Sequence, residues 1–371
     1  MNQPYDALLI VSFGGPEGMD EVMPFLENVL RGRNVPVERM HEVAHHYELF
    51  GGVSPINEQN RQLIHALEAE LAANNMRLPV YWGNRNWHPL LEDTLRQIAT
   101  DGRQRALAFV TSAYSSYSGC RQYREDIQRA REAVGPAAPH IDKLRVYYNH
   151  PGFIESNIAL VQHALDKIPA ENRAQAQIAF TAHSIPLSMA TNCNYEAQLL
   201  DACRLVAEGL NEGRGHERWR LVYQSRSGPA QQPWLEPDIC DYLKELKRAG
   251  SEDVVIAPIG FVSDHMEVLY DLDTEARQLC EELNLNMHRA ATVGTYPTFI
   301  KMIYELILER MAVEAGQDAP ARRYLGTRGP NHDLCPVDCC LMGAGRPTTP
   351  AASQVGQQAS ASSPASGMKI A

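Results

Sequence analysis

The sequence has no hydrophobic run long enough to cross a membrane. Even Ala106–Val110 and Val254–Val262 are only strand-sized, whereas a membrane-spanning helix needs about 20 apolar residues. The chain begins Met1-Asn-Gln-Pro-Tyr-Asp and runs directly into a strand-like segment, without the basic and apolar regions of a signal peptide. We therefore expect a soluble, cytoplasmic protein.

The sequence also has no run of lysine and arginine. Among 371 residues, 34 are basic and 45 are acidic, which gives a formal net charge of −11. Nucleic-acid binders carry a basic patch or stripe, so this class of partner is excluded. An acidic surface also argues against standing attachment to anionic lipid. We expect a monomer with no stable membrane insertion.

The usual nucleotide-binding signatures are absent as well. Gly14-Gly15-Pro16 follows the first strand-like segment but lacks the Gly-x-Gly-x-x-Gly spacing, and there is no Walker loop. We interpret the two glycines as a tight turn between a strand and a helix.

Short apolar runs alternate with longer amphipathic stretches along most of the chain. Such alternation predicts an α/β fold with parallel sheets covered by helices. The predicted strands are Ala7–Phe13, Pro79–Gly83, Ala106–Ser112, Leu144–Tyr148, Gln177–Thr181, Arg220–Gln224, Val254–Ile259 and Met287–Ala291. The predicted helices are Met19–Val29, Glu58–Ala73, Leu90–Thr100, Arg121–Ala133, Ile154–Lys167, Tyr195–Glu208, Ile239–Arg248, Met266–Leu283 and Pro297–Ala315.

About four strand–helix units lie on each side of residue 150. The pattern therefore predicts two similar lobes, residues 1–150 and 151–315, with a ligand-binding cleft between them. A cysteine-containing extension follows at 316–345. The Ala, Ser, Pro, Gln and Gly composition of residues 346–371 indicates a disordered tail.

Ligands of parallel sheets bind beyond the carboxyl ends of the strands. His183 stands at such an end, although a lone histidine there is more often structural. Glu267, Asp271 and Glu275 follow the strand Val254–Ile259 at steps of four, which places them on one helical face. Such a run is usually a solvated face, but this one starts beside the apolar Phe261-Val262. Imidazole and carboxylate together suit Fe²⁺, so we expect a metal and base site here.

Several strand-end motifs together resemble the ferrochelatases, in the same order from about residue 5 to 314. The motifs are Ser12-Phe-Gly-Gly-Pro-Glu, Phe50-Gly-Gly-Val-Ser-Pro-Ile, Thr181-Ala-His-Ser-Ile-Pro, Gln224-Ser-Arg-Ser-Gly with Pro233-Trp-Leu, and Gly260-Phe-Val-Ser-Asp-His-Met-Glu-Val-Leu-Tyr-Asp. The resemblance implies two Rossmann-like lobes that hold a porphyrin between them. It implies that His183 and Glu267 are the catalytic, iron-side pair, with Asp271 and Glu275 continuing the path of metal or protons.

The resemblance also implies a porphyrin-binding set. Its members are Phe13, Tyr47, Ser54, Tyr123 and Arg31. Phe13 departs from relatives that carry tyrosine, so it offers an apolar ring contact and no phenolate ligand. Relatives with arginine at the positions of Leu30 and His46 bind carboxylates there, so Arg31 or Arg33 is assigned that role here. Tyr114 and Tyr117 either line the pocket or serve packing.

Three of the eight cysteines, Cys335, Cys339 and Cys340, crowd into six positions of the extension. Some ferrochelatases hold a [2Fe–2S] cluster there, with a fourth cysteine from the core. Four thiolates are needed; Cys193 is our first choice for the fourth, with Cys203 and Cys120 as alternatives. The competing interpretation is a Zn²⁺ site that uses His332 and the three cysteines.

The resulting hypothesis is an enzyme, a ferrochelatase that inserts Fe²⁺ into coproporphyrin III. We prefer coproporphyrin III to protoporphyrin IX because the chain lacks an apolar, membrane-associating extension and resembles the soluble bacterial forms. A non-catalytic porphyrin or haem carrier, an iron–sulfur redox sensor and a cobalt or nickel chelatase are the other hypotheses.

Overall fold

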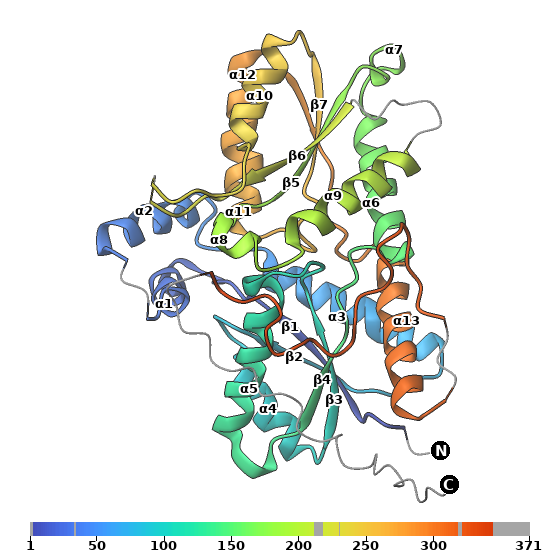
Figure 1. Cartoon of the computed structure of the whole chain (residues 1–371). Helices are drawn as coiled ribbons and strands as arrows, with labels where there is room; N and C mark the ends of the chain where they lie inside the picture. Colours follow the sequence, from blue (N-terminus) through green and yellow to red (C-terminus); the bar gives the residue numbers. More distant parts are fainter. Residues whose placement is uncertain (1–2, 33–34, 211–217, 230, 318–320, 344–371) are drawn as a thin grey trace, which may run out of the picture.

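The computed structural model contains two stacked α/β lobes, each built on a four-stranded sheet (Figure 1). It describes residues 3–32, 35–210, 218–229, 231–317 and 321–343. The first sheet has the order β2-β1-β3-β4 and the second has the order β6-β5-β7-β8. All ladders are parallel, as predicted, with Leu8 paired to Val80 and Ile178 to Val255.

Seven of the eight strands overlap the predicted apolar runs. The strands are β1 (Ala7–Ser12), β2 (Val80–Asn84), β3 (Arg105–Val110), β4 (His140–Lys143), β5 (Gln177–His183), β6 (Trp219–Gln224), β7 (Asp253–Ala257) and β8 (Asn286–Arg289). The prediction of a strand at Leu144–Tyr148 is wrong, because β4 ends at Lys143 after pairing with β3. The run that follows is buried without a ladder because its side chains pack between the lobes.

Most helices also match their predicted positions. They are α1 (Met19–Val29), α2 (Val37–Glu48), α3 (Ile56–Ala73), α4 (Leu91–Thr100), α5 (Gln122–Val134), α6 (Pro151–Leu165), α7 (Ala170–Arg173), α8 (Leu187–Ala190), α9 (Tyr195–Gly209), α10 (Ile239–Arg248), α11 (Met266–Val268), α12 (Arg277–Leu283) and α13 (Pro297–Glu314). In the part of the chain that the structure describes there are also two π-helical segments, η1 (Tyr117–Arg121) and η4 (Leu269–Ala276), and a 3₁₀ turn, η2 (Gly135–Ala137). The prediction of one α-helix over Met266–Leu283 is wrong in its middle, where η4 separates α11 from α12.

Alternate side chains of each strand face different cores, since successive side chains point to opposite faces of a sheet. In β1, Ala7, Leu9 and Val11 pack under α4 and α5. Leu8 and Ile10 face the other way, into a larger core. The second sheet has the same arrangement, with Val222 and Val254 beneath α10 and α12.

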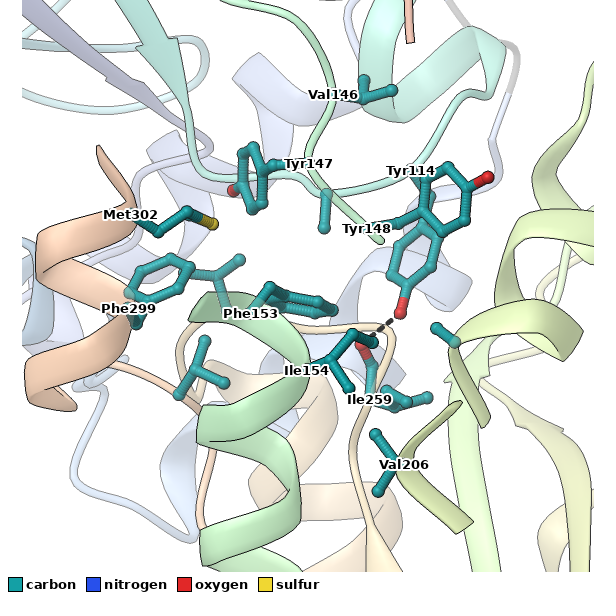
Figure 2. Close-up of a cluster of buried hydrophobic side chains, with 14 of the residues drawn as sticks. Tyr114, Val146, Tyr147, Tyr148, Phe153, Ile154, Val206, Ile259, Phe299 and Met302 are labelled. Carbon is teal, nitrogen blue, oxygen red and sulfur yellow. Dashed lines mark hydrogen bonds between the residues drawn. The ribbon is translucent and has the colours of Figure 1, made fainter. Parts of the chain in front are cut away.

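The larger core belongs to both lobes. It contains Leu8 and Ile10 of β1 together with Ile178 and Phe180 of β5. Residues 144–150, between β4 and α6, form the linker between the lobes. Figure 2 shows the aromatic centre of this core, where Tyr147 and Tyr148 of the linker and Phe153 of α6 lie among residues of both lobes. The hydroxyl of Tyr114 in the first lobe donates to the carbonyl of Ile259 in the second lobe, at 3.0 Å. The two sheets are therefore fixed against each other by a common apolar layer.

The C-terminal part of the chain connects the lobes a second time. Helix α13 packs against α6 and against α3 of the first lobe. The described residues 321–343 then cross the molecule between the lobes (Figure 1). The buried Arg121 donates to the carbonyls of Val337 and Cys339, while Gly343 lies tightly against Ser188 of the second lobe. The predicted tail, 346–371, lies outside the described residues.

No helix among the described residues is both long enough and apolar enough to span a bilayer.

Candidate active site

His183 and Glu267 meet at the carboxyl end of the second sheet. His183 is the last residue of β5, and Glu267 lies in α11, which follows β7. The His183 Nε2 atom is 3.7 Å from Glu267 Oε1, and the two side chains are 33% and 48% exposed. The Nδ1–H of His183 donates to the carbonyl of Ser184, which turns Nε2 toward the carboxylate. Metal-ligating histidines almost always donate their second ring N–H in this way, to a carboxylate, a backbone carbonyl or water.

The pair stabilises its own charges. Burial is the largest single effect and disfavours the charged form of each group, but the partner charges and hydrogen bonds together outweigh it. The Glu267 carboxylate and the Ser184 carbonyl raise the pKa of His183, and the His183 charge lowers the pKa of Glu267. At neutral pH the site therefore holds an imidazolium beside a carboxylate, and not the neutral imidazole that a free histidine would provide.

His265 is a third member of the site, which lies within the Gly260-Phe-Val-Ser-Asp-His motif but was not among the predicted site residues. Its Nδ1 accepts the backbone N–H of Glu267 at 3.2 Å and so caps α11. Burial and the charge of His183 lower the pKa of His265, against the opposing effect of Glu267. His265 is thus the neutral imidazole of the site. The feature of the sequence that could have identified His265 as a site residue is its position directly before Met266-Glu267.

Asp271 lies in η4 and continues the site from Glu267. Its carboxylate accepts hydrogen bonds from Gln224 Nε2 at 3.2 Å and from the Ser225 hydroxyl. Ser225 has a φ of 61°, a left-handed conformation that is uncommon for serine. Burial and the charges of Glu267 and Glu275 outweigh these bonds and raise the pKa of Asp271 to about 7.

Glu275 lies at the outer end of this acidic row. Burial and the charge of Asp238 raise its pKa, whereas a hydrogen bond from Tyr270 opposes the change. The Tyr270 ring stacks flat on His46 of α2, with ring centroids 3.5 Å apart. The charges of both Glu267 and Glu275 act on Asp271, so the three acids are neighbours. Glu267 lies in α11, whereas Asp271 and Glu275 lie in the π-helical η4.

The raised pKa of Asp271 predicts a specific pH dependence of stability. A carboxyl group with a folded pKa near 7 and an unfolded pKa near 3.8 binds more protons when folded, so it lowers stability as pH rises between those values. Asp271→Asn removes this titration but keeps an acceptor for Ser225. We expect the variant to gain stability over the wild type as pH increases from 4 to 7.5.

The free energy of unfolding, measured by urea denaturation at several pH values, checks this expectation. Asp241→Asn, at a surface carboxylate with a 72% exposed side chain, is the matched control and should give a difference that does not grow with pH. A constant difference for Asp271→Asn would contradict the assignment.

On the opposite side, Phe13 follows β1 and its ring is 38% exposed. It packs edge-on against Phe25, which in turn contacts Tyr47. Tyr47 is buried, and burial together with the charge of Glu267 raises its pKa. Met266 of the second lobe packs into the same apolar cluster. The structure therefore brings Phe13 and Tyr47 of the first lobe toward the His183–Glu267 pair.

The other predicted porphyrin residues lie in different settings. Ser54 is 4% exposed, and its Cβ is so near Gly15 that any side chain there would collide with it. Tyr123 is buried in the core beneath α5, with the Arg85 guanidinium 3.6 Å from its ring centroid. Arg31 is exposed just after α1, and Arg33 lies outside the described residues.

Tyr114 and Tyr117 are both buried. Tyr114 belongs to the common core, and the Tyr117 hydroxyl donates to Glu125 at 3.0 Å. These contacts favour the packing role for both residues.

A second group of metal-binding side chains lies in the extension. Ligand atoms of His332, Cys335 and Cys339 lie within 4.8 Å of one another. The Sγ atoms of Cys339 and Cys340 are 3.4 Å apart. Two thiols and one imidazole are thus drawn together by the fold, and Cys340 adds a third thiol beside Cys339. Such donors suit zinc or an iron–sulfur cluster.

The candidate fourth cysteines are placed differently. A hydrogen bond with Cys335 and burial raise the pKa of the Cys120 thiol. The pKa of Cys193 is raised by burial and by the nearby thiols of Cys339 and Cys120. Cys203 is fully buried in the common core. Cys120 and Cys193 are thus beside the extension, one in each lobe.

Solved structures with the same architecture include a chelatase. The chain matches the structure described as SirB from Bacillus subtilis with Fe³⁺, with a TM-score of 0.52 and 12% identity, covering 84% of this chain and 98% of that one. At this identity the likeness shows the fold alone, an α/β fold with two parallel sheets.

Curated relatives are much more similar. A ferrochelatase of Rhodopirellula baltica is 58% identical over 345 residues, covering 93% of this chain and 95% of that protein. A coproporphyrin III ferrochelatase of Streptomyces coelicolor is 56% identical over 358 residues, with the same coverage. The family model described as Ferrochelatase matches residues 5–311. The chain belongs to the ferrochelatase family.

Proposed function

We propose that this protein inserts Fe²⁺ into coproporphyrin III to form coproheme in haem biosynthesis. The observation that carries the proposal is the His183–Glu267 pair, held at the carboxyl end of a chelatase-type sheet. The choice of coproporphyrin III is supported by 56% identity to the Streptomyces coelicolor enzyme over 93% of the chain.

His183 and Glu267 act as the iron-side pair in this proposal. Bonds of about 2.0 to 2.2 Å join imidazole nitrogen and carboxylate oxygen to zinc, so atoms 3.7 Å apart can share one cation of similar size. The incoming Fe²⁺ displaces the proton that His183 holds beside Glu267, and this proton leaves to water by way of Asp271 and Glu275. Asp271 and Glu275 form the route by which metal or protons reach the pair.

Metal insertion releases two pyrrole protons, and the same row accepts them. Once the iron has moved into the ring, the raised pKa of His183 favours capture of one proton. Asp271, with a pKa of about 7, is partly ionised near neutral pH, and its ionised form accepts the second proton and releases it along the row. The site thus exchanges one dication for two protons with little net change in charge.

The porphyrin lies on the first-lobe side in this proposal. The exposed ring of Phe13 offers an apolar contact to the macrocycle, and Tyr47 and Ser54 are assigned beside it. Arg31, as an exposed cation, is assigned to a propionate. The assignment of Tyr123 to porphyrin binding rests on the family resemblance alone, because the structure places its ring in the core beneath α5.

We also propose that the extension holds a [2Fe–2S] cluster through Cys335, Cys339, Cys340 and one core cysteine. The closeness of Cys335 to Cys339, and of Cys339 to Cys340, supports it. Cys193 is the first choice for the core ligand. Cys120 is a strong alternative because it forms a hydrogen bond with Cys335. A Zn²⁺ ion on His332 and the cysteines is the alternative occupant. When bound, the cluster would supply one-electron redox chemistry.

Cys339→Ser tests the extension site. We expect the visible absorption of anaerobically purified protein to disappear, because a central ligand is lost. Cys240→Ser, on α10, is the control and should keep the spectrum. Cys120→Ser and Cys193→Ser identify the fourth ligand. Unchanged absorption in Cys339→Ser would exclude Cys339, while colourless wild-type protein with bound zinc would establish the alternative occupant.

The proposed reaction is tested by anaerobic incubation of the protein with Fe²⁺ and either coproporphyrin III or protoporphyrin IX, followed by absorption spectroscopy. We expect rapid metallation of coproporphyrin III and little of protoporphyrin IX. Faster metallation of protoporphyrin IX would reverse the choice of substrate. Binding of both without metallation would instead indicate a porphyrin carrier.

A further inference from the structure

Arg289 lies at the end of β8 and contacts two carboxylates at once. Its terminal nitrogens donate to Asp264 at 3.1 and 3.0 Å, in a bidentate pair. Its Nε lies 2.7 Å from Asp273 Oδ1. The Arg289 and Asp264 side chains are each 15% exposed and that of Asp273 is 22% exposed, so the three groups are largely shielded from water.

The two carboxylates are the ends of one functional stretch, residues 264–273, which we call the metal-side segment. Asp264 directly precedes His265, the cap of α11, and its N–H donates to Gln59 of the first lobe at 2.8 Å. Asp273 lies two residues after Asp271 in η4. Glu267 lies between these two anchored ends.

The guanidinium is suited to this position by its shape. Its planar fork binds one carboxylate with two parallel bonds and leaves Nε for another, which a lysine ammonium cannot reproduce. Without the positive charge of Arg289, the carboxylates of Asp264 and Asp273 would repel each other in a region largely shielded from water. Arg277 is only a weak substitute, since it lies 3.6 Å from Asp273 and its side chain is 44% exposed.

We propose that Arg289 is a positioning residue for metal insertion, which fixes the metal-side segment so that Glu267 faces His183. The inference rests on the proposed function. Arg289 acts through the backbone between Asp264 and Asp273 and contributes no ligand to iron. A small displacement of Glu267 would widen the 3.7 Å separation that the pair offers to a cation.

The test compares wild type, Arg289→Met, Arg289→Lys and the control Arg220→Met in steady-state metallation. Arg220 lies on β6, and its ion pair with Glu245 has side chains that are 43% and 60% exposed. We expect kcat to fall about 10- to 100-fold in Arg289→Met, the scale that misplacement by about 1 Å produces. The KM for porphyrin should stay unchanged, Arg289→Lys should be intermediate, and Arg220→Met should match wild type.

Hydrogen exchange followed by mass spectrometry gives a readout independent of turnover. In Arg289→Met, peptides of the metal-side segment should exchange faster, while peptides of the first sheet should not change. A wild-type kcat or unchanged exchange in this variant would overturn the proposal. If Arg289→Met does not fold, Asp273→Ala replaces it in the test, because this variant releases only the Asp273 end of the metal-side segment. A normal kcat in Asp273→Ala would also overturn the proposal. Failure of the wild type to metallate either porphyrin would count against the proposed function. In that case the hydrogen exchange of Arg289→Met and wild type would still show whether Arg289 fixes the metal-side segment.

Discussion

His183→Ala should abolish metal insertion while leaving porphyrin binding largely intact. The substitution removes the imidazole that faces Glu267 at 3.7 Å. It takes away both the proposed iron ligand and an imidazole whose pKa the site raises. General acid–base groups alone contribute about 10²- to 10⁴-fold to rate, and the lost ligand adds to this. Turnover should therefore fall by at least about 10³-fold.

The measurement is initial-rate metallation, with porphyrin affinity followed separately by fluorescence quenching. His163→Ala, at an exposed position on α6, is the matched control and should retain full activity. The binding measurement separates lost chemistry from lost folding. Normal turnover in His183→Ala would refute the catalytic assignment and leave Glu267 and Asp271 as the remaining candidates.

Arg145→Met should produce the largest loss of stability. Arg145 lies in the linker between the lobes with its side chain 1% exposed, and it binds Glu309 of α13 through bonds of 2.7 and 3.1 Å. The Glu309 side chain is 7% exposed. Removing one partner of a buried pair leaves the other charge uncompensated, which costs about 3 to 5 kcal/mol. Arg322, at 3.6 Å from Glu309, offsets only part of this cost.

Urea denaturation gives the free energy of unfolding for this comparison. The double variant Arg145→Met with Glu309→Leu should recover much of the loss, because replacing both charges by apolar groups is often neutral. Arg96→Met breaks an exposed ion pair with Glu92 and should cost about 0 to 1 kcal/mol. A cost for Arg145→Met as small as that of the control would show that the pair is not essential for stability.

The strands were predictable wherever burial on both faces produced an apolar run. β1, with all six residues buried, is such a case. β4 was missed because its sequence, His140–Lys143, is mostly polar, while the apolar run after it packs between the lobes. Helix α2 was missed for a related reason, since only Ala44 and Tyr47 of its twelve residues are buried. Apolar periodicity records buried apolar side chains, and these two elements have few of them.

The site was predictable in its chemistry and less so in its geometry. The strand-end position of His183 and the spacing of Glu267, Asp271 and Glu275 were visible in the sequence. A π-helical turn leaves no distinct pattern of its own, so η4 was not foreseen. The contact of Cys120 with Cys335 joins residues more than 200 positions apart, and only the folded chain brings them together.

The apolar core shared by both sheets makes the two lobes a single cooperative unit. Ile10 of the first sheet, Phe180 of the second and Phe299 of α13 belong to one continuous cluster. Separating the lobes would expose this cluster to water on both sides. Unfolding one lobe before the other would therefore carry a large free-energy penalty. Heat should therefore unfold the chain in one transition. A fragment ending at residue 150 should aggregate when expressed alone, although its sheet is complete.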